Sequence, residues 1–82
     1  MRQLTNTEED KKYLKKLLKK DNVDAEVTIG VFTSNLASSI IGYTYKKCSI
    51  IKIYNDGYVE WITEDRILQP TVSINCVKIK QE

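Results

Sequence analysis

The stretch "IKIYNDGYVEWITEDRI", residues 51–67, decides the fold of this chain. Within and around it, residues 48–54 and 58–64 alternate between apolar and polar side chains and flank Asn-Asp-Gly at 55–57. Gly57 adopts a positive φ at little cost, and Asn and Asp tolerate turn geometry. The pattern therefore predicts two antiparallel strands joined by a tight hairpin turn.

The two faces of this hairpin carry different side chains. Val59 and Trp61 share one face, while Glu60 lies on the other, where we expect it to pair with Lys52 across the strands. The favoured interpretation of Trp61 is an anchor of the hydrophobic core, and the alternative is a contact with a partner.

Three further segments have the pattern of strands. Residues 23–33 alternate over a long window, and residues 39–46 contain Gly42, which permits a bend or a close backbone approach. The polar run "TSNLASS" is expected to connect them. Residues 71–80 form a last strand, whose apolar phase shifts between Cys76 and Val77 and indicates a bulge.

A helix is predicted at about residues 6–21. Thr5 and Glu8 have the spacing of a capping box, and Thr7 with Asp10 is the competing choice. Acidic residues in the first turn and lysines in the last suit the helix dipole. At about 100° per residue one face is apolar and is expected to pack on the sheet. That face consists of Tyr13, Leu14, Leu17 and Leu18.

The predicted fold is α+β, in a single domain of residues 1–82. An N-terminal helix precedes a small, strongly bent, five-stranded antiparallel sheet or barrel, since short sequential strands at this spacing favour such architectures.

This order of elements resembles the Sm/Hfq-like proteins, whose N-terminal helix precedes five bent strands. The helix and first strand of that family are similar to "KKYLKKLLKKDNVDAEVTIGVF". Its second and third strands are similar to "IIGYTYKKCSIIKI", and its fourth strand and closing turn to "VEWITEDRI". Lys46 stands where the family usually has Asp, and the Lys-His pair with which bacterial members bind uridine-rich RNA is missing. The resemblance therefore implies an architecture, without the RNA site or the ring assembly.

Composition excludes several kinds of chemistry. The chain has no His, which excludes His-based catalysis and most zinc sites. Its carboxylates lie on a turn, a strand and a strand end, and no serine has a nucleophile context, so we expect no enzyme, no metal and no cofactor. Cys48 and Cys76 have no C-x-x-C spacing and are expected to be reduced and half-buried, and a disulfide between them requires that their two strands lie side by side. No apolar run approaches a membrane span and the first residues lack a secretion signal, so a cytoplasmic protein is expected.

Lysines and aromatic residues supply the candidate binding surface. One helix face carries six lysines, four pairs of which repel each other at i,i+4, and Glu8 is expected to relieve only Lys12. A solvated face is the ordinary explanation of such a run, and a functional surface is the alternative. The candidates are Lys11, Lys12, Lys15, Lys16, Lys19, Lys20, Lys46 and Lys47, together with Tyr43, Tyr45, Tyr58 and Trp61.

Three functions remain after these exclusions. The first is a small non-enzymatic regulator or inhibitor that binds another protein of its host, such as the host-defence inhibitors of phages and mobile elements; Tyr and Trp commonly anchor such interfaces. The second is RNA or DNA binding through the lysines, against which stands a net charge of only +2. The third is an oligomeric nucleotide sponge, since the edge strands of a small sheet invite pairing with a second copy.

Overall fold

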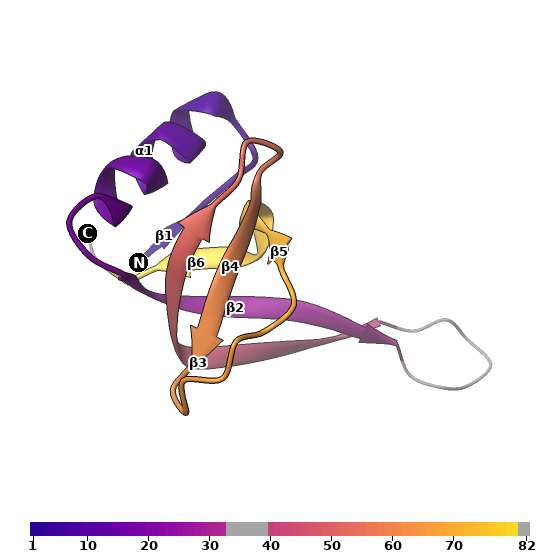
Figure 1. Cartoon of the computed structure of the whole chain (residues 1–82). Helices are drawn as coiled ribbons and strands as arrows, with labels where there is room; N and C mark the ends of the chain where they lie inside the picture. The colour runs from indigo at the N-terminus through magenta and orange to yellow at the C-terminus, as the bar shows by residue number, and fades with distance from the viewer. Residues whose placement is uncertain (33–39, 81–82) are drawn as a thin grey trace.

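A computed structural model describes residues 1–32 and 40–80, which form one helix and one antiparallel sheet (Figure 1). The predicted α+β class is confirmed. The polar connector predicted at 33–39 lies outside the described residues. The elements are β1 (Arg2–Gln3), α1 (Glu8–Leu18), β2 (Val23–Phe32), β3 (Ile40–Ile53), β4 (Tyr58–Thr63), β5 (Val72–Ser73), the 3-10 helix η1 (Ile74–Cys76) and β6 (Val77–Ile79).

The sheet is strongly curled but open. Its strand order is β1-β6-β2-β3-β4-β5, so β5 lies at one edge and β6 is the second strand from the other edge. Only the three residues of η1 join β5 to β6, and three residues span at most about 10 Å. The sheet must therefore curl until its two sides approach each other. Among the described residues no ladder joins β1 to β5, so the closed barrel that was one of the two predicted forms is not found.

The described sheet has six strands instead of the predicted five, and three differences account for the number. The two strands predicted around residues 40–46 and 48–53 are one continuous strand, β3 (Ile40–Ile53), because bulges bend it without breaking it. Ala25 pairs with Cys48 and Val27 with Tyr45, so two residues of β3 face one of β2. A second register shift follows Ile50, where β3 pairs with β4.

The other two differences lie at the ends of the chain. The segment predicted as one strand at 71–80 is divided into β5, η1 and β6, and the 3-10 turn replaces the bulge expected beside Cys76. The side chain of Ser73 caps this turn by accepting a hydrogen bond from the N–H of Asn75. The unpredicted strand β1 has only two residues and is defined by its pairing with β6, where Arg2 lies opposite Ile79.

Helix α1 is shorter than predicted at both ends: it ends at Leu18, with Lys19 as its C-cap, and at its start Thr7, not Thr5, is the N-cap. The Thr7 hydroxyl accepts a hydrogen bond from the N–H of Asp10 at 3.2 Å. The Asp10 carboxylate accepts from the N–H and the hydroxyl of Thr5, each at 2.8 Å, and pairs with Arg2 at 2.7 Å. These bonds, led by the Thr5 N–H, hold the pKa of Asp10 below its ordinary value. They also fix the start of the helix to β1.

The core forms where the predicted apolar stripe of α1 packs on the inner face of the sheet. Trp61 is its largest fully buried side chain, 1% exposed, and its indole N–H donates to the carbonyl of Pro70 at 3.0 Å. Val23, Ile50 and Trp61 lie opposite one another on β2, β3 and β4. The predicted register of Lys52 with Glu60 is confirmed, as is the hairpin turn, in which Gly57 has φ 90°.

Candidate functional site

An open groove lies between the first half of β3 and the segment that follows β4. It encloses about 550 Å³, and its largest exposed apolar side chains are Tyr43, 56% exposed, and Ile67, 57% exposed. We call it the aromatic groove. Its lining residues are Tyr43, Thr44, Tyr45, Lys46, Lys47, Thr63, Glu64, Asp65, Ile67 and Gln69.

The aromatic side chains of this groove are connected to the core. The Tyr43 ring meets the Tyr45 ring edge-on with centroids 4.8 Å apart, and Tyr45 meets Trp61 in the same way at 5.1 Å. Exposure falls along this series, from exposed Tyr43 through half-buried Tyr45 to buried Trp61. Tyr43 and Tyr45 are therefore accessible to a partner, and their rings are held in place by packing on Trp61. Trp61, also a candidate for partner contact, is withdrawn into the core because its ring packs there.

A second hairpin turn forms the other wall of the groove. The N–H of Arg66 donates to the carbonyl of Thr63, and the N–H of Thr63 donates to the carbonyl of Ile67. Ile62 and Leu68 then form an antiparallel bridge. Residues 63–67 thus have the hydrogen-bond pattern of a three-residue hairpin loop, in which the last loop residue takes a positive φ. That residue is Arg66, with φ 66°.

Sequence reasoning missed the apolar part of this wall. Ile67 and Leu68, 57% and 60% exposed, follow the strand and belong to no periodic segment. The resemblance assigned the end of "VEWITEDRI" only to a closing turn. The local signal for a turn here is Asp65, because Asp is common in turns.

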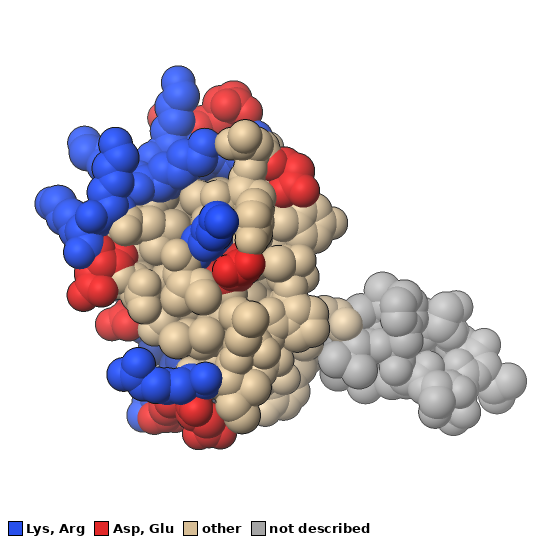
Figure 2. Space-filling view, viewed as in Figure 1, with Lys and Arg blue, Asp and Glu red and all other residues tan. Residues whose placement is uncertain are grey.

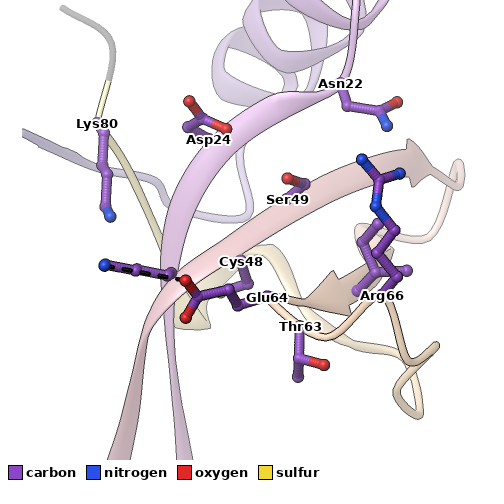
Figure 3. A pocket seen from close by; sticks show the side chains of 10 residues that line it. Asn22, Asp24, Cys48, Ser49, Thr63, Glu64, Arg66 and Lys80 are labelled. Carbon is purple, nitrogen blue, oxygen red and sulfur yellow. Dashed lines mark ion pairs between the residues drawn. The ribbon is translucent and has the colours of Figure 1, made fainter.

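A second hollow lies on the outer face of the sheet (Figure 3), and the residues that it shares with the aromatic groove are Lys47, Thr63 and Glu64. It encloses about 420 Å³, and we call it the polar pocket. Its lining residues are Asn22, Asp24, Lys47, Cys48, Ser49, Ile62, Thr63, Glu64, Arg66 and Lys80. Lys47 and Glu64 form an ion pair across its mouth, with 3.9 Å between nitrogen and oxygen.

The six helix lysines do not form one solvated face. The ammonium groups of Lys11 and Lys15 each donate to Asn55, at 3.2 Å, and so cross to the tip of the first hairpin. The prediction that Glu8 relieves Lys12 is wrong as to its ion pair, because Glu8 pairs with Lys11 at 2.8 Å. This contact holds the pKa of Glu8 below its ordinary value. The remaining members are exposed and lie over α1, where Figure 2 shows most of the basic atoms of this view. They are Lys12, Lys16, Lys19 and Lys20.

Tyr58, 46% exposed, lies away from these hollows because it begins β4 whereas the groove lies at the end of that strand. Near it, the Tyr54 hydroxyl donates a hydrogen bond to Glu60, and Lys52 lies 4.8 Å from the centre of the Tyr54 ring. The bond to Glu60 raises the pKa of Tyr54. These contacts within the protein explain why Lys52, Tyr54 and Glu60 lie together on the outer face of the first hairpin.

The described residues gather few groups suited to catalysis. Cys48 is buried, its thiol donates to the carbonyls of Ala25 and Tyr45 at 3.3 Å, and burial raises its pKa. Cys76 is half-buried, and both thiols are free. Within residues 1–32 and 40–80, no group of three ligand-type side chains could hold a metal ion, and no helix is long and apolar enough to cross a membrane.

No protein-family model matches this chain, and neither the curated proteins nor the solved structures include one that matches it. The resemblance to the Sm/Hfq-like proteins therefore rests on a helix followed by a small curled sheet.

Proposed function

We propose that this protein acts without catalysis, by binding another protein through the aromatic groove. The observation that supports this most directly is the exposure of Tyr43 and Ile67 on opposite walls of one hollow. Large apolar side chains that gather in an exposed hollow favour contact with a partner, and tyrosine is among the residues that most often anchor such contacts.

The aromatic side chains of the groove are held in place before a partner binds. Tyr43 rests on Tyr45, which rests on the buried ring of Trp61. Side chains that are already held in place lose less conformational entropy when a partner binds. A rigid aromatic wall therefore converts more of its contact area into affinity than a flexible one.

The charges around the groove also suit a protein partner. Lys46 and Lys47 stand on one wall and Glu64 and Asp65 on the other. A rim of both signs gives orientation and selectivity to a protein interface. A polyanion such as RNA would meet two carboxylates there. We infer a regulator or inhibitor, of the kind that phages and mobile elements direct against host proteins, because a small domain can block a partner merely by covering its surface.

The test compares two exposed tyrosines. The tagged protein is expressed in cells of its natural host, and the proteins that copurify with the wild type, Tyr43→Ala, Ile67→Ser and Tyr58→Ala are quantified. We expect a partner that is lost with Tyr43→Ala and Ile67→Ser but retained with Tyr58→Ala, which lies at the other end of β4. All three changes are at exposed positions, so thermal melting should stay close to that of the wild type.

Purified partner and variants then give the magnitude. Loss of an anchoring aromatic side chain costs at least about tenfold in affinity. A partner that binds all four proteins equally, or that depends on Tyr58 and not on Tyr43, would refute the groove as the binding surface.

The exposed lysines of α1 and of the turn that follows it support a second candidate, nucleic-acid binding. Lys12, Lys16, Lys19 and Lys20 have no ion pair within the part of the chain that the structure describes. If all four contact phosphates, the logarithm of the affinity for duplex DNA should fall with the logarithm of salt concentration at a slope of about −3 to −4. Replacing all four with Gln should abolish this binding, whereas a flat salt response excludes it.

A further inference from the structure

The residue that distinguishes the two hairpin turns of this protein is Arg66. The turns at 54–58 and 63–67 have the same hydrogen bonds: the fourth residue donates to the carbonyl of the first, and the first donates to the carbonyl of the fifth. The fourth residue has a positive φ in both, 90° for Gly57 and 66° for Arg66. A side chain at such a φ is strained, and glycine is the residue that avoids the strain. Arg66 therefore occupies its position at a conformational cost.

The side chain of Arg66 extends into the polar pocket. Figure 3 shows its guanidinium directed toward Asn22, over the strand that carries Ser49. Among the described residues the guanidinium has no ion pair and no hydrogen-bond partner. Strained backbone conformations concentrate at functional sites, where they are retained because the side chain that they position takes part in the function. An arginine held in this way at the mouth of a hollow indicates a ligand.

The charges of the pocket favour an anion. Arg66, Lys47 and Lys80 supply three positive charges against the two carboxylates of Asp24 and Glu64. Glu64 already forms an ion pair with Lys47, with 3.9 Å between nitrogen and oxygen. Lys80 has no ion pair within residues 1–32 and 40–80. The guanidinium of Arg66 and the ammonium group of Lys80 are therefore left to attract an anionic ligand.

Neutral hydrogen-bond donors complete the lining. The hydroxyl of Ser49 on β3 and the side-chain amide of Asn22, just before β2, come from neighbouring segments of the sheet. Ser49 lies opposite Asp24 on β2 and opposite Ile62 on β4, so the floor of the pocket is a row across three strands. Its volume of about 420 Å³ is that of a site for a small molecule.

We propose that the polar pocket binds a phosphate group, free or as the monoester of a small molecule, with Arg66 as its main donor. The planar guanidinium offers two parallel N–H groups to the oxygens of a phosphate, while Lys80 adds a positive charge to the pocket. The Ser49 hydroxyl, on the outer face of the sheet, can donate to a remaining oxygen. This inference does not rest on the aromatic groove, and it gives the hypothesis of a nucleotide-binding protein a specific site.

The test uses inorganic phosphate and AMP as probes at constant ionic strength, with amide chemical shifts as the readout. We expect saturable shifts at Asn22, Ser49, Thr63 and Arg66 that sodium chloride does not produce. Phosphate and AMP of equal affinity indicate a site for the phosphate group alone, and tighter AMP binding indicates a nucleotide-type ligand. The absence of saturable shifts with both probes would overturn the proposal.

Variants separate a binding role from a structural one. Arg66→Gly should weaken binding of the probe at least about tenfold, since it removes a charge-assisted contact. Because this change also removes the backbone strain, loss of folding cannot explain the result. Glu64→Gln should tighten binding, since it removes a negative charge, and Lys16→Ala on the exposed face of α1 should leave it unchanged. Equal affinity in Arg66→Gly and the wild type, or weaker binding in Glu64→Gln, would overturn the proposal.

Discussion

The two hairpin turns allow the strain at Arg66 to be measured as a difference in stability. Because the turns share one hydrogen-bond pattern, exchanging the residue type at their positive-φ position should have opposite effects. Arg66→Gly should stabilise the protein, and Gly57→Ala should destabilise it. Arg66→Ala is the matched control, since it removes the charged side chain but keeps a Cβ at φ 66°.

The expected magnitudes follow from the backbone. A Cβ in the left-handed region costs about 1–2 kcal/mol, and glycine loses about 0.4–1 kcal/mol through the greater freedom of the unfolded chain. Arg66→Gly should therefore gain about 0.5–1 kcal/mol over Arg66→Ala. For a domain of this size that gain raises Tm by about 2–8 °C.

Gly57 has a second constraint besides its φ. A Cβ at this position would lie 2.4 Å from the side-chain oxygen of Asn6 and 2.8 Å from its Cγ. Asn6 is held by a hydrogen bond from its N–H to the side chain of Asn75. Gly57→Ala should thus cost about 1–3 kcal/mol.

Urea unfolding at 25 °C, followed by the fluorescence of the single tryptophan, provides the assay. Trp61 is buried in the folded protein, so its emission reports unfolding directly. The slope of the free energy against urea should be the same for all variants if only the native backbone is affected. An Arg66→Gly protein no more stable than Arg66→Ala would show that the turn is unstrained and would refute the reasoning.

Three further predictions concern the core and the helix. Asp10→Asn should lower the free energy of unfolding by about 1–3 kcal/mol at pH 7. Because folding lowers the pKa of Asp10, the wild type should lose this extra stability as pH falls below about 4. Urea unfolding should therefore give a smaller difference in stability between the two proteins at pH 3 than at pH 7. Trp61→Ala should lower the free energy of unfolding by about 3–5 kcal/mol and unfold much of the protein, as circular dichroism would show. Trp61→Phe, which removes the hydrogen bond to Pro70 but keeps an aromatic ring, should lower it far less. Equal losses of stability in the two variants would contradict the packing described. Lys11→Ala should cost about 0.5–1.5 kcal/mol and Lys12→Ala almost nothing in thermal melts, because Lys11, unlike Lys12, bonds to Asn55. The reverse order would show that α1 does not cross the hairpin tip.

The elements predicted correctly depend on nearby residues. The turn at Gly57 is encoded by three consecutive residues, and the inward face of Trp61 follows from alternation along a single strand. The apolar stripe of α1 follows in the same way from the period of the helix. The boundaries of α1 were less accurate because two threonines offered equally spaced caps, and only the position of Asp10 between Thr5 and Arg2 decides for Thr7.

The candidate sites depend on contacts between distant segments, which no local pattern records. Lys11 and Lys15 turn toward Asn55 because α1 lies across the first hairpin tip. Tyr43 was a candidate from its residue type, but its neighbour Ile67 follows a strand end and carried no signal. The polar pocket combines residues from β2, β3 and the second turn with Lys80, and the curl of the sheet brings Lys80 there.

Arg66 shows most clearly what the sequence conceals and how a function can be separated from a structural role. In the sequence it is an arginine after two acidic residues, and its backbone conformation cannot be read from that context. If the side chain only helped to fold the turn, replacing it with glycine would change stability and leave phosphate binding unaffected. If it binds phosphate at the cost of strain, the same replacement raises stability and lowers affinity. Opposite changes in two measurements on one variant cannot arise from damage to the fold, which would lower both.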